Sequence, residues 1–326
     1  MVNKISQKIK GGLLGVAIGD ALGFPFEGLS REEMASKSLD NYSPGPYPPG
    51  TWSDDTSLTF CTVESLLERG FFDPDDLAQR FRLWFKEGHL TPFGQAIGFG
   101  RTTTEAIRRY LSGTPALLCG GRDERSNGNG SLMRILPVAI FYTWQPLEAM
   151  LEAVHQASKV THAHPRSQMA CGFYALLVRG LLRPSETLSE PGREEAYRRT
   201  VSLFLDFYRL QREFAPELIH FDRLLSLGFG DLPQKEIKSR AYVIHTLEAA
   251  VWCLLRGQNF MDTLSQALRL GGDTDTIGAV TGGLAGIFWG LEQIPLYLVE
   301  GLVKSGKLVA LSEKFAERVE VFAYAC

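Results

Sequence analysis

The chain has 326 residues, enough for one large domain or two ordinary ones, and enough to bury a core without disulfide bonds. Hydrophobic residues make up 44% of the sequence and charged residues 22%, which is typical of a soluble globular protein. The formal net charge is −3, from 34 basic and 37 acidic side chains, and there is no basic stripe or tail. This charge pattern argues against a nucleic-acid-binding or membrane-surface protein.

Apolar residues follow helical spacing along most of the chain. Residues 56–69 and 241–256 each place large apolar side chains on one stripe, as an amphipathic helix does. The other predicted helices cover residues 4–22, 74–87, 93–111, 131–143, 146–160, 165–182, 192–212, 259–270, 275–290 and 310–323. Because the alternating patterns typical of strands are nearly absent, the sequence predicts an all-α fold with short connections.

Three segments are predicted to be loops. The prolines and glycines of residues 41–52 exclude a helix, and residues 119–130 are polar and rich in glycine. Residues 184–191 form a third loop, which we expect to be exposed. None of the three resembles a linker, and the composition does not shift along the chain. We therefore expect a single domain over residues 1–326.

The sequence predicts a cytoplasmic protein, which we expect to be a monomer. The most apolar run, residues 276–290, is shorter than the roughly 20 residues that span a bilayer, and we expect it to be a buried core helix. The residues after Met1 do not have the layout of a signal peptide. Five widely spaced cysteines without a CxxC pair predict reduced, mostly buried thiols.

Small residues recur along the first predicted helix, at Gly11, Gly15 and Gly19 among others, and they permit another helix to pack closely. Glu27 follows this helix in a turn flanked by glycine and proline, between aromatic residues. A carboxylate in such a setting could have a raised pKa and take part in proton transfer. A surface glutamate beyond a helix end explains the local sequence equally well. We interpret Asp20 as a hydrogen-bonding group rather than a catalytic one.

Four consecutive side chains carry oxygen at Ser53, Asp54, Asp55 and Thr56, between the first loop and the helix that follows it. A helix cap explains part of this pattern, because serine, threonine and aspartate are preferred there and acids suit a helix N-terminus. A cap needs one such side chain, however, and two adjacent carboxylates repel each other. A hard cation would relieve that repulsion.

A glycine-rich turn with the sequence NGNGS lies at residues 127–131, ahead of another predicted helix. Glycines bring backbone N–H groups close to a ligand, and a helix N-terminus favours anions, so the turn suits a phosphate. An ordinary glycine turn with a serine cap is the alternative, and the local sequence barely distinguishes the two.

Two histidines, His162 and His164, stand just before the predicted helix at residues 165–182. No cysteine or third histidine stands nearby in the sequence, so we do not expect these two to bind a metal ion. We expect one of them to form a hydrogen bond with a ligand or a loop.

Acids and hydroxyls gather again at Asp273, Thr274, Asp275 and Thr276, where the apolar helix of residues 275–290 starts. That helix should be tied into the core, where two unpaired carboxylates would be costly. Oxygen ligands select Mg²⁺, Mn²⁺ or Ca²⁺ rather than Zn²⁺. Four carboxylates could neutralise two divalent ions, and a pair of metals about 4 Å apart can hold and activate a water or a diol. The sequence therefore predicts that the two acidic clusters form one metal-binding hydrolase site.

In this order, the five motifs resemble those of the ADP-ribosylglycohydrolase family. The similarity runs from GDALGFPFEG through WSDDTS, NGNGSLMR and THAHPRS to GGDTDTIGA, about residues 11–290. Each motif alone is weak evidence, whereas the combination is highly specific. The resemblance implies a compact all-α fold of orthogonally packed helices with a dinuclear Mg²⁺ or Mn²⁺ centre.

The resemblance also implies which residues bind the two cations. The family's first motif often begins with threonine, and its position is taken here by Ser53, which keeps the hydroxyl. Metal binding should therefore survive this difference. The expected metal ligands are Ser53, Asp54, Asp55, Asp273, Asp275 and Thr276.

The expected catalytic residues follow from the same resemblance. They are Glu27 and Asp55, with Glu27 as the base or as a group that gates the substrate. The metals would chelate the 2- and 3-hydroxyls of the ribose, and a water would attack its C1. The expected contacts to ADP-ribose are Asn129, Gly130, Ser131 and His162, with backbone N–H groups of the loop on the diphosphate.

The implied reaction is hydrolysis of the N-glycosidic bond between ADP-ribose and an arginine of a modified protein, with O-linkage to serine as the alternative. The expected partners are the ADP-ribosylated protein and ADP-ribose itself. Two other functions compete with this one. A protein of the same fold could bind ADP-ribose and metal without turnover, but the expected ligands are all retained. A dinuclear phosphoesterase usually has several histidine ligands, and this chain has six histidines in all.

Overall fold

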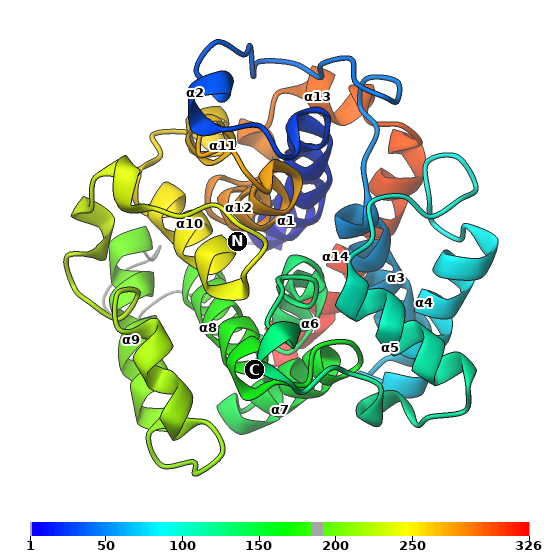
Figure 1. Ribbon diagram of the computed structural model, residues 1–326, viewed down its shortest axis with the longest axis vertical. Coiled ribbons are helices and arrows are strands. Elements are labelled where there is room, and N and C mark those ends of the chain that lie inside the picture. Colours follow the sequence, from blue (N-terminus) through cyan, green and yellow to red (C-terminus); the bar gives the residue numbers. More distant parts are fainter. Residues whose placement is uncertain (1, 184–191, 326) are drawn as a thin grey trace.

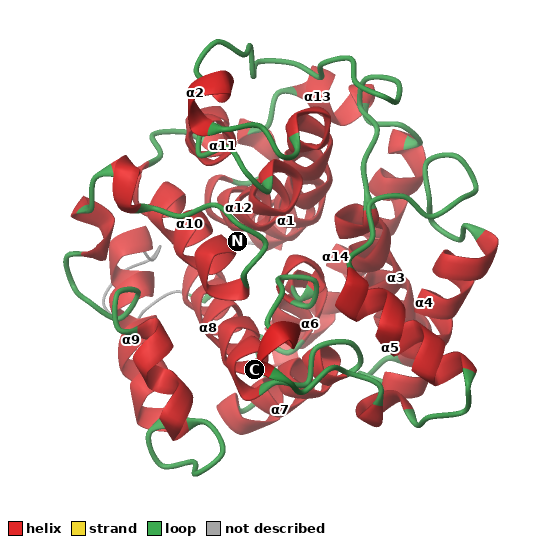
Figure 2. Cartoon of the chain, in the orientation of Figure 1, coloured by secondary structure: helices red, strands yellow, loops and turns green. Residues whose placement is uncertain are grey.

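Helices form nearly all of the regular structure in the computed structural model (Figure 1). The structure describes residues 2–183 and 192–325, and the side chains of residues 4–183 and 192–321. Figure 2 shows the same helices joined by loops, and the described residues contain no strand. The all-α prediction is therefore confirmed. The predicted loop at residues 184–191 lies outside the described residues, as does Cys326. The four other cysteines are buried free thiols.

The order of helices agrees with the predicted order, and α4 and α8 match the predicted ranges. The helices are α1 Val2–Gly23, α2 Arg31–Met34, α3 Asp54–Arg69, α4 Pro74–Glu87, α5 Arg101–Leu111, α6 Leu136–Phe141, α7 Leu147–Lys159, α8 Pro165–Leu182, α9 Arg193–Tyr208, α10 Val243–Arg256, α11 Phe260–Leu268, α12 Thr274–Trp289, α13 Leu296–Gly301 and α14 Ser305–Ala325.

Two predicted helices are wrong in part. The range 93–111 is helical only from Arg101, because Gly94 and Gly98 adopt positive φ angles of 80° and 67° that a helix does not allow. The range 131–143 is split into a 3₁₀ turn, Leu132–Arg134, and the short helix α6, because Pro137 is tolerated only in the first turn of a helix. Helices α2 and α13 were not predicted.

The central pair of helices is α1 and α12, which lie side by side in the middle of the molecule (Figure 1). They run antiparallel, with glycines of one helix facing glycines of the other. A Cβ atom added at Gly15 would lie 2.2 Å from the carbonyl oxygen of Gly282, and one added at Gly19 would lie 2.0 Å from that of Gly278. The two backbones therefore touch directly. This register sets the end of α1 against the start of α12, where acidic residues lie.

We expect Gly19→Ala to lower the free energy of unfolding by at least about 2 kcal/mol, because a methyl group at this position meets backbone rather than a side chain that could move. Urea denaturation monitored by circular dichroism measures the change. Gly306→Ala in α14 is the matched control, because a Cβ atom there meets nothing within 4 Å. Equal stability of the two variants would contradict the proposed close contact of α1 and α12.

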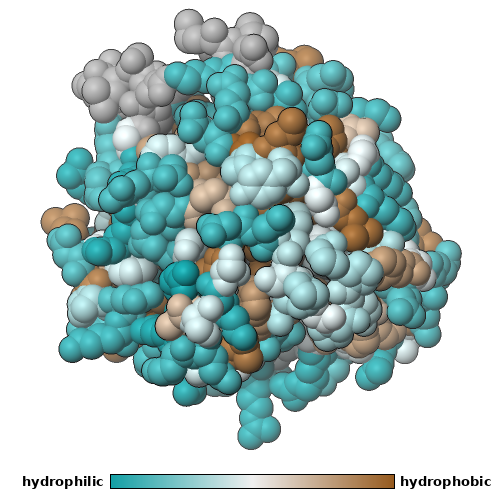
Figure 3. Space-filling model, turned by 90° about the horizontal axis from the view of Figure 1, so that it is seen from above, coloured by the Kyte–Doolittle hydropathy of each residue, from teal (hydrophilic) through white to brown (hydrophobic). Residues whose placement is uncertain are grey.

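One described helical segment, Lys4–Phe26, is long and apolar enough to cross a membrane by length and composition alone, and 83% of its apolar window is buried inside the protein. Such burial is expected of a core helix in a soluble protein. The face shown in Figure 3 is largely hydrophilic, with hydrophobic residues in small separate groups. The apolar helix α12, which contains most of the run at residues 276–290, is buried in the core, as predicted.

Candidate functional site

The first acidic cluster lies at the N-terminus of α3, where Ser53 is the N-cap. The Ser53 hydroxyl accepts the backbone N–H of Asp55 and donates to the Asp55 carboxylate at 3.1 Å. Behind the cap lies the buried carboxylate of Asp20 in α1. It accepts the backbone N–H groups of Ser53 and Thr56 and the Thr56 hydroxyl, at 2.6 to 3.1 Å. Asp20 therefore holds the first turn of α3 in place.

We expect Asp20→Ala to lower the free energy of unfolding by at least about 2 kcal/mol, because it leaves two buried N–H groups and a hydroxyl without their acceptor. Asp20→Asn, which keeps one acceptor oxygen, should cost less. Chemical denaturation of both variants measures the difference. Asp40→Ala, at an exposed position, serves as the control. An Asp20→Ala variant as stable as the control would show that Asp20 does not hold α3.

The second acidic cluster begins at a turn of two glycines, Gly271 and Gly272, with φ angles of 69° and 76°. A side chain at Gly272 would lie 2.1 Å from the carbonyl oxygen of Ser239, so only glycine fits there. The Gly28 N–H donates to the Gly272 carbonyl, and the Gly272 N–H donates to the Leu29 carbonyl, both at 2.7 Å. These bonds tie the segment that carries Glu27 to the start of α12.

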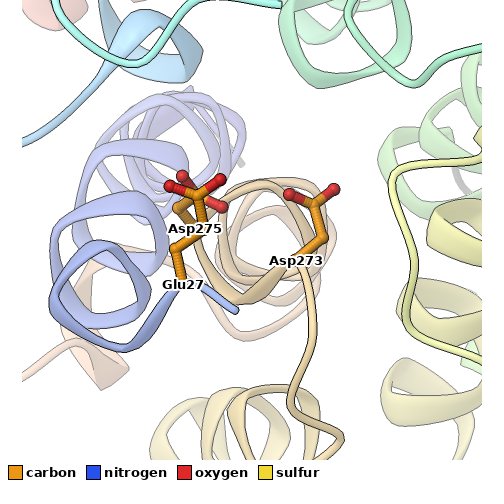
Figure 4. Close-up of side chains that lie close together, drawn as sticks. All are labelled: Glu27, Asp273 and Asp275. Atoms are coloured by element: carbon orange, nitrogen blue, oxygen red, sulfur yellow. The ribbon is translucent and has the colours of Figure 1, made fainter. Parts of the chain in front are cut away.

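Three carboxylates meet at this point. Carboxylate oxygens of Glu27, Asp273 and Asp275 lie within 4.8 Å of one another, and Figure 4 shows their carboxyl groups pointing to the same side of the start of α12. Thr276 joins this group to the first cluster, because its hydroxyl donates to the Asp55 carboxylate at 3.4 Å. The structure therefore brings the two acidic clusters of the sequence together.

Burial and mutual repulsion both act on these acids. Burial is the main cause that raises the pKa values of Asp54, Asp55 and Asp275 well above the ordinary range, and neighbouring carboxylates raise them further. Burial also raises the pKa of Asp273, although the Asn129 amide donates to it and opposes the shift. Without a compensating positive charge, the ionised cluster is therefore unfavourable at neutral pH.

The residues present fit a divalent cation. The Oδ1 atom of Asp55 is buried, and no hydrogen-bond donor among the described residues reaches it. A buried carboxylate oxygen without a partner is costly, and a bound cation would remove that cost. The donor atoms in the cluster are carboxylate and hydroxyl oxygens, which suit Mg²⁺ or Mn²⁺ rather than Zn²⁺.

The acids open into a cleft of about 320 Å³. One part of its lining is acidic and includes Asp54, Asp275 and Glu27, and Glu27 is exposed to solvent. That exposure agrees with a surface glutamate beyond a helix end, which was one of the two interpretations of the local sequence. The rest of the lining consists of Gly98, Phe99, Gly100, Arg101, Thr102, Thr103, Gly128, Asn129, Gly130, Met133, His162, Ala241, Asp273 and Thr276.

The glycine-rich turn contributes Asn129 and Gly130 to the cleft, and their two backbone N–H groups differ in whether they have an acceptor. The backbone N–H of Asn129 donates to the Ala241 carbonyl at 3.1 Å, and its amide donates to Asp273 and Thr246. The N–H of Gly130 has no hydrogen-bond acceptor among the described residues and is free for a ligand. Asn129 therefore orients an acid of the cluster.

Two predicted site residues lie behind the cleft wall. Ser131 is fully buried, and its hydroxyl is engaged with Ser158 and Cys171, so its side chain points away from a ligand. Asp55 is 1% exposed, beneath Ser53 and Thr276. Its position suits a metal ligand better than a base that touches the substrate.

The segment of residues 98–103 lines the cleft, and it is not among the predicted site residues because the predicted helix at residues 93–111 includes it. The helix α5 begins here at Arg101, and its N-cap Gly100 provides no side-chain cap. Free backbone N–H groups at a helix N-terminus attract anions. The sequence carries a signal for this loop in Gly98 and Gly100, the second of which directly precedes Arg101.

Comparison with known proteins gives consistent matches over nearly the whole chain. The family model described as ADP-ribosylglycohydrolase matches residues 1–322. The ADP-ribosylarginine hydrolase Tri1 of Serratia proteamaculans is 30% identical over 94% of this chain and 78% of its own. The ADP-ribosyl-[dinitrogen reductase] glycohydrolase of Rhodospirillum rubrum is 30% identical over 89% of this chain and 88% of its own.

A solved structure is similar over a comparable range. It is described as an ADP-ribosylglycohydrolase-related protein complex, with a TM-score of 0.78 and 31% sequence identity. The match covers 97% of this chain and 99% of that one. The arrangement of helices around the cleft is therefore shared with a protein of known structure.

Proposed function

Because this chain belongs to the ADP-ribosylglycohydrolase family, we propose that it hydrolyses the glycosidic bond between ADP-ribose and a side chain of a modified protein. The observation that carries the proposal is the make-up of the cleft, in which an acidic, cation-compatible part adjoins a part that contains Arg101, two threonines and glycines. ADP-ribose has a matching make-up, with ribose diols and a diphosphate.

The acidic part suits the ribose next to the scissile bond. Asp54, Asp273 and Asp275 would hold divalent cations there, with Ser53, Asp55 and Thr276 completing the ligand set. When bound, two such ions would supply the positive charge that orients the ribose hydroxyls and activates a water. Asn129 keeps the Asp273 carboxylate in position through a hydrogen bond from its amide.

The other part suits the diphosphate. The start of α5, at Arg101, Thr102 and Thr103, presents uncapped N–H groups and a positive helix end to the cleft. The free N–H of Gly130 lies in the same lining. We therefore assign diphosphate binding to the Gly130 N–H, one of the loop N–H groups that the sequence suggested, and to residues 101–103, whereas the Asn129 N–H is already bonded to Ala241.

Glu27 is our candidate for the general base or for the group that gates the substrate. It is exposed, belongs to the cleft lining, and lies beside Asp273 and Asp275. A carboxylate in this place can accept a proton from a water that attacks C1 of the ribose. The buried Asp55 lacks such access and would act by holding the cations.

We propose arginine as the modified side chain. Two relatives, each 30% identical to this chain, are named as an ADP-ribosylarginine hydrolase and as an ADP-ribosyl-[dinitrogen reductase] glycohydrolase.

The test offers arginine-, serine- and nucleobase-linked ADP-ribose side by side, each with Mg²⁺ and with Mn²⁺, and measures free ADP-ribose by chromatography. We expect release from the arginine linkage. Release from serine alone would replace the arginine assignment and keep the enzyme class. Binding of ADP-ribose without release from any linkage, or release of inorganic phosphate alone, would overturn the proposed function.

A further inference from the structure

Arg134 is a fully buried cation behind the wall of the cleft. One of its nitrogens, Nη2, donates to the Ala157 carbonyl at 3.0 Å and to the Thr161 hydroxyl oxygen at 2.8 Å. Its guanidinium carbon lies 4.6 Å from the ring centroid of Phe81. The remaining nitrogens, Nε and Nη1, have no acceptor among the described residues. A buried cation with so few hydrogen-bond acceptors is costly, which indicates a role other than packing.

Thr161 connects Arg134 to the cleft. Its hydroxyl oxygen is buried and lies 2.8 Å from Nδ1 of His162, which lines the cleft. Because a guanidinium can only donate, the Thr161 oxygen must accept from Arg134. The hydroxyl hydrogen then needs an acceptor, and Nδ1 of His162 is the atom in reach.

The opposite arrangement is unfavourable. With a hydrogen on Nδ1, the Thr161 oxygen would face two donors, and its own hydrogen would be buried without an acceptor. A buried hydroxyl hydrogen without an acceptor is costly. Burial also lowers the pKa of His162 to about 3, so the ring is neutral and carries one hydrogen. With Nδ1 accepting, that hydrogen is on Nε2.

We propose that Arg134 is a positioning residue, which acts through Thr161 to hold His162 as the tautomer with its hydrogen on Nε2. The ring then presents a fixed, uncharged donor to an oxygen atom of a ligand in the cleft. A Cβ atom added at Gly130 would lie 2.9 Å from Cε1 of His162 and 3.4 Å from Nε2. The Nε2 donor therefore stands next to Gly130, on the side to which we assign the diphosphate.

This inference rests on the proposed function only for the identity of the ligand, because the tautomer is a property of the free protein. The first measurement needs no variant. Long-range ¹H–¹⁵N spectra of protein labelled with [¹⁵N]histidine distinguish a protonated from an unprotonated ring nitrogen, and His162→Gln identifies the signals. We expect an unprotonated Nδ1 and a protonated Nε2 in the wild type. A hydrogen on Nδ1 would overturn the proposal.

The second measurement compares variants of the connecting hydroxyl. Thr161→Val removes the hydroxyl and should give a mixture of the two tautomers, with the Kd for ADP-ribose raised about three- to tenfold by the loss of one oriented hydrogen bond. Thr161→Ser should restore both readouts. Thr281→Val is the matched control, because Thr281 is fully buried and its hydroxyl has no partner among the described residues.

The outcomes separate this proposal from the proposed function. A Thr161→Val protein that folds and keeps His162 wholly in the Nε2–H form would overturn the positioning role. So would an Arg134→Lys protein that loses ADP-ribose affinity without any change in the tautomer. Where a variant does not fold, the wild-type spectrum decides. A wild-type protein with the expected tautomer and no affinity for ADP-ribose would contradict the proposed function and leave the tautomer intact.

Discussion

Replacing Asp54, Asp55 or Asp275 with alanine is expected to reduce the release of ADP-ribose by at least about a thousandfold and to leave the fold intact. Each change removes a candidate metal ligand, and bound cations of this kind contribute several kcal/mol of charge stabilisation in the transition state. The fold should persist, because the three carboxylates are buried and repel one another. Chromatography of free ADP-ribose measures the loss, and circular dichroism checks the fold.

The matched control for these variants is Asp75→Ala. Asp75 also lies in the first turn of a helix, α4, but its side chain is exposed and is not part of the cleft lining. This variant should keep wild-type activity. Full activity of all three cluster variants in buffer freed of divalent cations would refute the metal-dependent reaction.

Removal of divalent cations is expected to make the protein less stable as the pH rises. Burial raises the folded-state pKa of Asp20 to about 6. Burial is also the main cause that raises the pKa values of Asp54, Asp55 and Asp275 well above their ordinary range. The folded protein therefore binds more protons than the unfolded chain above about pH 4. The contribution of the cluster to the free energy of unfolding is therefore most favourable below that pH. It is lost as the pH rises through the folded-state pKa values of these acids.

A variant isolates this contribution from all other titrating groups. Asp55→Asn should be more stable than the wild type by at least about 1 kcal/mol in EDTA at neutral pH, because it removes one repelling charge. The gap should close below about pH 4, where the wild-type acid becomes protonated in the unfolded state as well as in the folded state. Added Mg²⁺ or Mn²⁺ should raise the melting temperature of the wild type at neutral pH and have much less effect on the variant. A wild type as stable as Asp55→Asn at neutral pH without cations would contradict the repulsion.

The sequence determined the fold class and most of the helices because both depend on local patterns. Helical spacing predicted α4 and α8 without error, and the prolines and glycines of residues 41–52 marked a true loop. The errors at residues 93–100 and 131–135 also have local causes. The first segment contains Gly94 and Gly98, which adopt positive φ angles, and the second precedes Pro137, which must lie in the first turn of α6. Short helices such as α2 and α13 lack enough residues to show a period.

The acidic residues of the candidate site could also be found from the sequence, since two runs of carboxylates at helix starts are visible without coordinates. Their juxtaposition could not be found in this way. Glu27 meets Asp273 and Asp275 because glycines of α1 and α12 let two backbones touch in one register, and because the Gly28 and Gly272 peptides bond to each other. Contacts of this kind join residues nearly 250 positions apart in a chain of 326 residues, and no local pattern encodes them.

What the tertiary structure alone decided is which atoms face the cleft. Local sequence favoured the backbone N–H groups of Asn129 and Gly130 equally, but the Asn129 N–H donates to the Ala241 carbonyl and the Gly130 N–H has no acceptor among the described residues. The Ser131 hydroxyl is turned to Ser158 instead of to the cleft. The start of α5 lines the cleft only because the tertiary structure places it beside the glycine-rich turn. The sequence by itself determined the chemistry that is available, because residue types carry it. The direction of each hydrogen bond depends on neighbours distant in the chain, and only the packed structure brings them together.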